Sequence, residues 1–143
     1  MSSIRHAFSV DVEDWYQGIE LPLEAWIGKE NRVDIGLSKT LDLLAERNIE
    51  ATFFTLGAVA KSNPKSIRLI AEQGHEIGSH TMSHEKIYDL NPTEFLRQEK
   101  ECKKILEDTS ESKVNGFRAP YFSITTQSLW ALDILAELGY TYD

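Results

Sequence analysis

Two histidines spaced four residues apart, His80 and His84, form the clearest chemical signal in this 143-residue sequence. Imidazole is the commonest side-chain ligand for zinc and related divalent metals. Because residues i and i+4 lie on one face of a helical turn, both rings could reach a single ion. The same spacing also fits a polar loop that binds no metal, so the interpretation depends on the groups around the pair.

Carboxylates occur where a predicted strand ends. Residues 7–12 alternate between apolar and polar side chains, which indicates a strand, and Asp11, Glu13 and Asp14 lie at its carboxyl end. Burying a carboxylate is costly unless a partner compensates its charge, so Asp11, inside the apolar run, is a candidate functional acid. Glu13 and Asp14 equally fit solvated loop charges. A third polar group, the Arg-Ala-Pro-Tyr segment 118–121, follows another predicted strand.

The elements that must position these groups alternate along the chain. Short β-branched or aromatic runs predict strands at residues 7–12, 51–57, 76–78, 114–117 and 140–143. Apolar residues at helical spacing, with capping residues at the ends, predict helices at residues 33–47, 63–73, 91–108 and 126–138. Such alternation is typical of parallel strands covered by helices, the α/β class. No repeat or linker divides the pattern, so residues 1–143 are predicted to form a single domain.

A long loop, residues 15–31, separates the first strand from the first helix and contains Trp15, Tyr16 and Trp26. Loops of this length in compact domains are often functional. The three aromatic side chains could stack on a sugar ring or cap the core, and the sequence favours neither interpretation.

Composition argues against two classes of partner. The formal net charge of −8 disfavours nucleic acid, because phosphate binding needs a basic surface. No stretch approaches the roughly 18 apolar residues that span a bilayer. The N-terminus has no apolar secretory segment, so we expect a cytoplasmic location. The single cysteine, Cys102, falls on the apolar side of a predicted helix and is expected to be a buried, unreactive thiol.

The candidate groups share one position, directly after strands. In a β/α barrel, the active site is built from loops at the carboxyl ends of the strands. Two histidines and one carboxylate, Asp14 or Glu13, match the ligand count of a catalytic metal site. A bound metal activates water and polarises a carbonyl, and an unligated carboxylate can act as general base. These groups predict metal-assisted hydrolysis of an amide or ester.

The remaining polar groups have complementary roles in that reaction. Asp11 is our candidate for the base, and the fixed charge of Arg118 could orient it. The backbone around Tyr121 could donate a hydrogen bond to a tetrahedral oxyanion.

Three motifs in this order carry a family resemblance: Asp-Val-Glu-Asp after a strand, Ser-His-Thr-Met-Ser-His, and Phe-Arg-Ala-Pro-Tyr. Together they resemble the polysaccharide deacetylases of carbohydrate esterase family 4, the NodB-homology domain. The spelling Phe-Ser-Val-Asp-Val-Glu-Asp-Trp-Tyr-Gln is similar to a bacterial branch linked to exopolysaccharide biosynthesis. The resemblance extends over nearly the whole chain, residues 8–142.

The resemblance implies a distorted, partial β/α barrel and a hydrolase that removes N- or O-acetyl groups from polysaccharides, acting on carbon–nitrogen bonds other than peptide bonds. It implies that Asp11 is the base, positioned by Arg118, and that His80 and His84 bind the metal. Tyr121 would line the site through its backbone amide. The mixed nitrogen and oxygen ligands suit Zn²⁺ best, although other divalent metals are compatible with them.

Two departures from the family pattern shape these expectations. The family's first motif has adjacent aspartates, whereas Val12 separates Asp11 from the following acids. We favour Asp14 as the carboxylate ligand and keep Glu13 as the alternative, since strand alternation would place Glu13 on the same face as Asp11. The family's later motifs, including a histidine thought to be the general acid, have no counterpart here. We therefore expect the chain to be the N-terminal part of a longer deacetylase domain, or else an unusually short member of the family.

Two alternatives to the polysaccharide deacetylase remain open. Without the general acid, the chain could be a non-catalytic remnant that binds metal or glycan. Related domains of the same fold also hydrolyse small cyclic amides. A partial barrel exposes a strand edge and apolar helix faces, so we also expect self-association or marginal stability.

Overall fold

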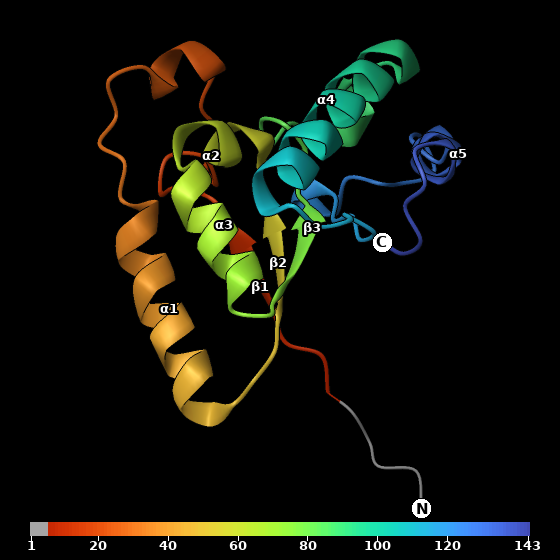
Figure 1. Ribbon diagram of the computed structural model, residues 1–143. Helices are drawn as coiled ribbons and strands as arrows, with labels where there is room; N and C mark the ends of the chain where they lie inside the picture. Colours follow the sequence, from red (N-terminus) through yellow and green to blue (C-terminus); the bar gives the residue numbers. More distant parts are fainter. Residues whose placement is uncertain (1–5) are drawn as a thin grey trace, which may run out of the picture.

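The computed structural model describes residues 6–143, which form a three-stranded parallel sheet surrounded by helices (Figure 1). The strands β1 (Ser9–Val12), β2 (Thr52–Thr55) and β3 (Glu76–Ser79) lie side by side in that order. Asp11 pairs with Phe54, which pairs with Gly78. Because all three strands are parallel, their carboxyl ends meet at one edge of the sheet. The α/β architecture of the predicted partial barrel is confirmed.

Beyond β3 the sheet continues only as isolated parallel bridges. Ser79 pairs with Phe117, and Gly116 pairs with Tyr142. The predicted strands 114–117 and 140–143 are therefore present in place but much shorter than expected. In the segment 114–118, the last hydrogen bond to β3 is donated by the Arg118 N–H to the Ser79 carbonyl oxygen, at 2.8 Å. The chain then turns at Pro120, which has no N–H to continue a ladder.

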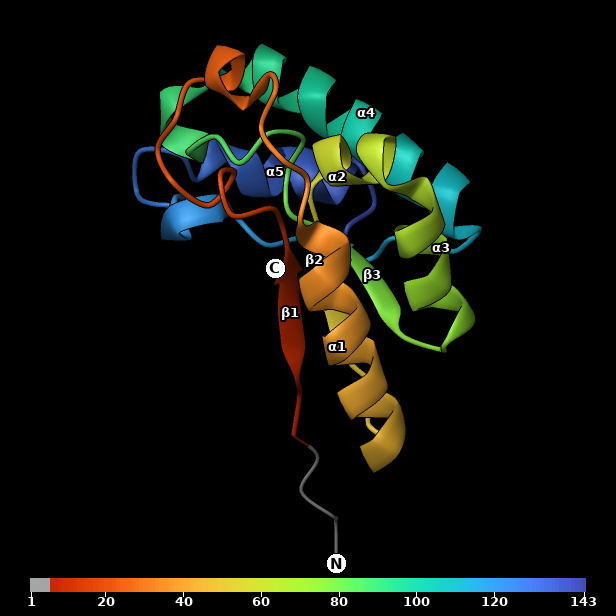
Figure 2. The same ribbon diagram turned by 90° about the vertical axis from the view of Figure 1, so that its left-hand side faces the viewer.

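Five α-helices of the described part of the chain surround the sheet: α1 (Val33–Arg47), α2 (Gly57–Ser62), α3 (Pro64–Glu72), α4 (Pro92–Ser110) and α5 (Trp130–Glu137). Short 3₁₀ helices occupy Leu23–Trp26, Ile87–Asp89 and Pro120–Phe122. Figure 2 shows α1 alongside β1 and β2, α3 beyond β3, and α4 along the top of the view. The core between the helices and the sheet contains fully buried side chains, among them Phe53, Ile70, Ile77, Phe95 and Leu106. No helix of residues 6–143 combines the length and apolar character needed to cross a membrane.

Asn91 and Asn48 mark helix ends as predicted, whereas Asn63 makes no side-chain cap at the start of α3. The Asn91 side chain accepts a hydrogen bond from the Glu94 N–H at 3.0 Å, which confirms the predicted cap of α4. Asn48 ends α1 in the left-handed conformation, at φ 51°. The predicted helix 126–138 begins only at Trp130, because Thr125 and Ser128 form a hydrogen-bonded turn instead. The expected burial of Cys102 is confirmed, since its side chain is fully enclosed.

Helix α2 was not predicted, and it explains why Gly57 follows β2. A Cβ atom at residue 57 would lie 2.7 Å from Met82 Sδ and 3.0 Å from Cys102 Sγ, so a larger residue would have to displace these side chains. The backbone N–H groups of Gly57 and Ala58 donate to the carbonyl oxygens of Thr81 and Met82, each at 3.0 Å. The start of α2 thus holds the loop that carries both histidines.

Candidate metal centre

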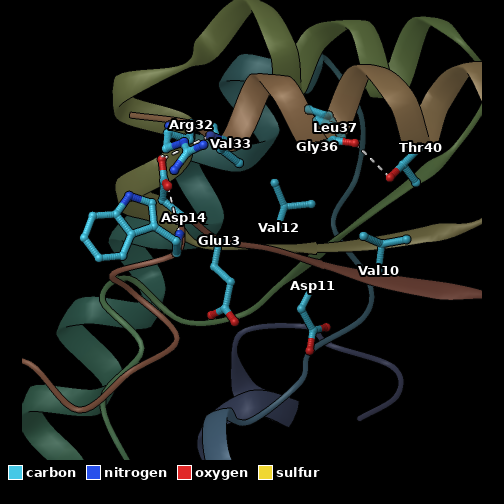
Figure 3. Close-up of a pocket in the computed structure, with 11 residues that line it drawn as sticks. Val10, Asp11, Val12, Glu13, Asp14, Arg32, Val33, Gly36, Leu37 and Thr40 are labelled. Atoms are coloured by element: carbon cyan, nitrogen blue, oxygen red, sulfur yellow. Dashed lines mark hydrogen bonds between the residues drawn. The ribbon is translucent and has the colours of Figure 1, made fainter. Parts of the chain in front are cut away.

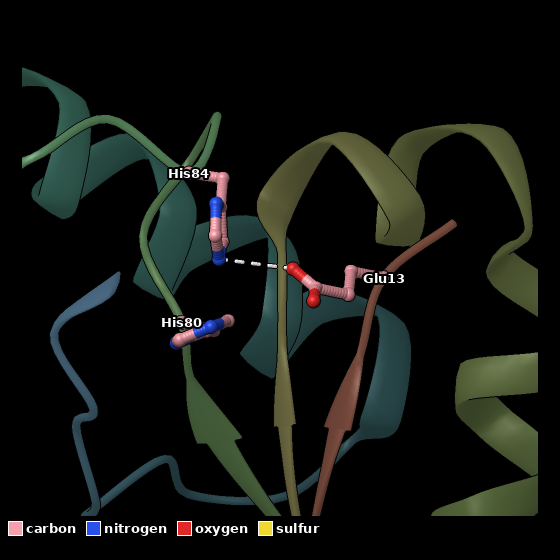
Figure 4. A group of neighbouring side chains, drawn as sticks. All are labelled: Glu13, His80 and His84. Carbon is pink, nitrogen blue, oxygen red and sulfur yellow. Dashed lines mark ion pairs between the residues drawn. The ribbon is translucent and has the colours of Figure 1, made fainter. Parts of the chain in front are cut away.

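Three candidate ligands converge at the carboxyl edge of the sheet. Glu13 follows β1, and His80 and His84 follow β3 (Figure 4). One oxygen or nitrogen atom from each of these side chains lies within 4.8 Å of the other two. Glu13 Oε2 is 3.0 Å from His84 Nε2, and both histidine side chains are almost fully buried. The geometry supplies two imidazoles and one carboxylate around a common point.

The histidine pair does not lie on a helical turn, in contrast to the geometry assumed from its spacing. Residues 80–86 form an irregular loop in which Thr81 and His84 adopt the left-handed conformation, at φ 71° and 60°. Thr81 Oγ1 accepts a hydrogen bond from the His84 N–H at 3.1 Å and stabilises this turn. The two imidazole rings still approach each other, with 4.9 Å between their centroids.

His80 is fixed in orientation by the backbone. Its N–H donates to the Thr55 carbonyl oxygen at 3.0 Å, and its Nδ1 lies 2.8 Å from the Arg118 carbonyl oxygen. Because a carbonyl oxygen can only accept, Nδ1 carries the proton and Nε2 keeps its lone pair toward the carboxylates. Burial lowers the pKa of His80, which favours the neutral imidazole that binds metals.

Asp11 and Arg118 form the predicted ion pair. Arg118 Nη1 donates to Asp11 Oδ1 at 2.6 Å, and its Nη2 donates to Ser9 Oγ at 2.9 Å. The guanidinium carbon lies 4.0 Å from the centroid of the Phe54 ring, a cation–π contact that fixes the group from one side. The other oxygen, Asp11 Oδ2, is 3.9 Å from His80 Nε2, so the carboxylate borders the candidate ligands.

The structure does not place Asp14 with the histidines, which corrects the preference for Asp14 over Glu13 as the carboxylate of this group. Asp14 is almost fully buried, and its Oδ2 accepts from the N–H groups of Arg32 at 2.7 Å and Val33 at 3.1 Å (Figure 3). Its Oδ1 accepts from the Trp15 N–H at 2.8 Å. Successive side chains point to opposite sides of an extended chain, so Glu13 follows the direction of Asp11 and Asp14 turns toward α1.

Tyr121 lies beside the candidate ligands, in a segment with unusual backbone geometry. Tyr121 and Phe122 both have left-handed backbones, at φ 55° and 51°. The Tyr121 ring packs edge-on against His84, with 4.7 Å between the two ring centroids. The Lys86 ammonium lies 5.3 Å from the centroid of the Tyr121 ring. This conformation turns the residue toward the histidine loop.

Two open hollows meet at His84 and Tyr121. One has a volume of about 680 Å³ and is bordered by Asp11, His80, Arg118 and the exposed Phe122. The other has a volume of about 340 Å³ and lies against the loop that contains Trp26. His84 thus borders both hollows, and His80 borders the larger one.

Two aromatic residues of the 15–31 loop differ in exposure, which bears on whether the loop caps the core or could stack on a sugar ring. Tyr16 is buried and packs edge-on against both tryptophans, with ring centroids 5.6 and 5.9 Å apart. Trp15 keeps half of its surface exposed and donates from Nε1 to the Glu30 carbonyl oxygen at 3.2 Å. Tyr16 therefore belongs to the packed interior of the loop, whereas Trp15 presents an aromatic face to solvent.

Sequence reasoning missed the residues that hold the site in place. Ser9 bonds to Arg118, Thr81 closes the histidine turn, and Gly57 anchors the loop from α2. Thr81 lies inside the histidine motif, so the sequence could have indicated that its hydroxyl stabilises the turn. Ser9 acts across 109 positions of sequence, and no local pattern indicates such a contact.

Comparison with known proteins gives a consistent result. Residues 34–142 match the family model for polysaccharide deacetylase. A chitooligosaccharide deacetylase of Sinorhizobium fredii is 37% identical over 98 residues, which cover 68% of this chain and 43% of the relative. A peptidoglycan-N-acetylglucosamine deacetylase of Bacillus cereus is 31% identical over 130 residues, which cover 82% of this chain and 47% of the relative.

A solved structure supports the same assignment of the fold. The Bc1960 peptidoglycan N-acetylglucosamine deacetylase superposes with a TM-score of 0.71 at 28% identity, covering 95% of this chain and 54% of the solved chain. The present chain spans less than half the length of the two curated relatives.

Proposed function

The chain belongs to the polysaccharide deacetylase family, and we propose on this basis that it acts in the metal-dependent removal of acetyl groups from a polysaccharide. The observation that carries the proposal is the group formed by Glu13, His80 and His84, with the ion-paired Asp11 beside it. The parallel sheet brings these residues to one edge although they come from distant parts of the sequence. Metal-assisted hydrolysis needs a metal, a base and access to solvent, and this edge offers a place for each.

The donor set fits a divalent metal. Two imidazole nitrogens and one carboxylate oxygen are the protein ligands of many catalytic zinc sites, which leave one position for water or substrate. Glu13 Oε2 is buried and has no hydrogen-bond partner among residues 6–143, apart from its ion pair with His84. An orphaned carboxylate oxygen that faces two imidazoles is costly without a cation. We propose Zn²⁺ as the metal.

The surrounding residues have roles that follow from their positions. A divalent metal at this site would supply Lewis acidity toward the acetyl carbonyl and the attacking water. Arg118 holds Asp11 Oδ1, which leaves Oδ2 directed toward His80 and available to accept a proton from water. We assign Asp11 as the general base and Arg118 as the residue that positions it. The backbone N–H of Tyr121 is proposed to donate to the oxyanion.

The substrate is proposed to be an acetylated glycan. Two relatives are named for chitooligosaccharides and for peptidoglycan N-acetylglucosamine, so an N-acetylated sugar polymer is our first candidate. The half-exposed Trp15, which lines one hollow together with Asp11 and Glu13, offers a stacking surface for a sugar ring. The resemblance of the segment around Asp11 to the exopolysaccharide branch supports a role in exopolysaccharide biosynthesis, and we propose a cytoplasmic location.

Zinc titration by calorimetry, followed by acetate release, tests this function. We expect one zinc site per chain, lost in His84→Ala and retained in Asp14→Ala, and acetate release from chitopentaose that depends on added zinc. Absence of zinc binding by the wild-type chain would contradict the metal assignment. Zinc binding without acetate release from acetylated glycans would contradict the hydrolase and favour a non-catalytic binding domain.

Self-association is a further part of the proposal. Strand β1 is paired with β2 on one side, and Phe8 beside it exposes about half of its surface. Unpaired strand edges with apolar neighbours promote association between chains. Sedimentation analysis across a range of concentrations should show species larger than the monomer; a monomer at every concentration would contradict this expectation.

A further inference from the structure

A buried carboxyl group that the proposed chemistry does not use lies directly behind the histidine loop. Glu99, on α4, is fully enclosed. Its Oε1 accepts hydrogen bonds from Ser79 Oγ and from Tyr140 Oη, each at 2.5 Å. These partners lie 20 and 41 positions away in the sequence, so a single oxygen connects three segments of the fold.

Ser79 connects Glu99 to the backbone on both sides of His80. Its hydroxyl donates to Glu99 and accepts from the Thr81 N–H at 3.3 Å. Its carbonyl oxygen accepts from the Arg118 N–H at 2.8 Å, and the Arg118 carbonyl in turn binds His80 Nδ1. The backbone before His80, the backbone after it and the acceptor of its ring are therefore all linked to Ser79.

Tyr140 provides the second arm. Its ring packs against Phe117, with 5.8 Å between centroids, and its hydroxyl binds Glu99. The neighbouring Thr141 donates to the Asn115 carbonyl oxygen at 2.8 Å, and Phe117 donates to the Tyr142 carbonyl oxygen at 3.0 Å. Through this arm Glu99 holds the segment 115–118 from the side opposite β3.

Glu99 is held in the interior without a neutralising cation. No salt bridge within residues 6–143 involves it, and Lys103 on the next turn donates instead to the Leu138 carbonyl oxygen at 2.9 Å. Burial raises the pKa of the Glu99 carboxyl, which favours the protonated form. In that form the carbonyl oxygen accepts two hydrogen bonds, and a glutamine amide would present the same oxygen.

We propose that Glu99 is a positioning residue for His80, acting through the Ser79 hydroxyl on the backbone and the ring acceptor of this histidine. The inference rests on the proposed function only in treating His80 as a metal ligand. A buried polar group that merely stabilised the fold could be replaced by a side chain of similar shape without changing the site. A positioning residue requires its accepting oxygen, and that difference can be measured.

The variants Glu99→Gln, Glu99→Leu and Ser79→Ala separate the two roles. Glutamine retains the accepting oxygen, leucine removes it, and alanine at 79 removes the connection to His80 while keeping Glu99. Ser110→Ala is the matched control, because Ser110 is a buried serine of α4 whose hydroxyl binds the Leu106 carbonyl oxygen away from the site. All four are compared as folded chains, well below their melting temperatures.

The first measurement is the nitrogen NMR spectrum of the His80 ring in the zinc-free chain. We expect wild type, Glu99→Gln and Ser110→Ala to show the Nδ1–H tautomer, and Glu99→Leu and Ser79→Ala to show a mixture of tautomers. The second measurement is zinc affinity by competition with a chelator. Since groups that support a metal ligand typically contribute about 10- to 100-fold to affinity, we expect about a tenfold loss in Glu99→Leu and Ser79→Ala and none in Glu99→Gln.

An unchanged tautomer and zinc affinity in folded Glu99→Leu or Ser79→Ala would overturn the inference, even if their melting temperatures fell. If Glu99→Leu does not fold, Ser79→Ala decides the result. The ring tautomer is measured without zinc, so a wild-type chain that fails to bind zinc would contradict the proposed function while leaving this test of Glu99 intact.

Discussion

Glu13 and Asp14 are adjacent in sequence, yet their carboxylates lie in two different environments at the end of β1. Asp14 lies in the hollow beside α1 (Figure 3), where three backbone N–H groups donate to it. Glu13 lines the same hollow, but its side chain points away from Asp14 (Figure 3), and its Oε2 faces His84 (Figure 4) without a hydrogen-bond donor from the backbone of residues 6–143. Backbone N–H groups compensate the charge of the Asp14 carboxylate. The Glu13 carboxylate has no such donors in the described part of the chain and remains available to a cation.

This difference separates a structural acid from a functional one. A carboxylate that accepts several backbone N–H bonds at a helix start stabilises that helix end. A carboxylate surrounded by imidazoles is stabilised by a cation. The comparison therefore predicts that the two neighbouring acids affect different measured quantities when each is removed, and the same reasoning extends to the histidines.

The largest effect is expected for a ligand histidine. His80→Ala removes one of three donors, and we expect zinc affinity to fall at least 100-fold, about 2.7 kcal/mol, with loss of any deacetylase activity. Calorimetry and acetate release measure both effects, and His75→Ala, which lies before β3, is the control that should bind zinc normally. Activity that survives the loss of His80 would show that the metal assignment is wrong.

A smaller effect on zinc is expected from the carboxylates. Glu13→Ala should weaken zinc binding by about 10- to 100-fold, a loss on the order of 1.4–2.7 kcal/mol. Asp14→Ala should change zinc affinity less than threefold, since its carboxylate faces α1. Chelator competition on the two purified variants at low temperature makes the comparison. Equal losses in both variants would remove the distinction between the two acids.

The reverse order is expected for stability. Asp14→Ala leaves the N–H groups of Arg32 and Val33 without their acceptor, so the free energy of unfolding should fall by about 1–3 kcal/mol. Glu13→Ala should lower the stability of the zinc-free chain less than Asp14→Ala does, because no backbone N–H of the described residues loses its acceptor. Urea denaturation in the presence of a chelator measures both. A stable Asp14→Ala chain would contradict the role of Asp14 at the start of α1.

The sequence predicted most of the scaffold because its signals are local. The limits of α1 follow from apolar spacing and from Asn48, and the start of α4 follows from Asn91, whose side chain makes the expected cap. Strands β1 and β2 are two and three residues shorter than predicted, and β3 is one residue longer. Helix α2 was missed because its need for Gly57 arises from Met82 and Cys102. Contacts of that kind exist only once the chain has folded.

The sequence predicted which residues would meet at the candidate site, but not which carboxylate would lie with the histidines. The positions of three polar groups after strands indicated that Asp11, the histidines and Arg118 would meet, and the structure places them together. The structure groups Glu13, rather than the preferred Asp14, with the histidines, as strand alternation indicates. The cap of α1 comes from Asp14, 18 positions before Arg32, and no short-range capping motif describes this contact.

The smallest expected effect concerns the histidine at the other end of β3. His75 Nδ1 accepts a hydrogen bond from the Ala51 N–H at 3.3 Å, which only the unprotonated nitrogen can do. Burial lowers the pKa of His75, opposed by the charge of Glu50. In the unfolded chain the ring protonates near its ordinary pKa of about 6.5. The unfolded state therefore binds more protons as pH falls below that value, and the stability contributed by neutral His75 is lost there.

We therefore expect His75→Asn, which keeps an accepting oxygen but cannot protonate, to flatten the fall in melting temperature between pH 7 and mildly acid pH. The exposed His6 provides the control, and His6→Asn should leave the pH profile unchanged. Thermal melts in zinc-free buffer at several pH values measure the effect. An identical slope in wild type and His75→Asn would mean that His75 does not titrate with unfolding. A flatter slope would show that neutral His75 stabilises the fold. His75 and His80, at the two ends of β3, would then differ as Asp14 and Glu13 do: one stabilises the fold and the other binds the metal.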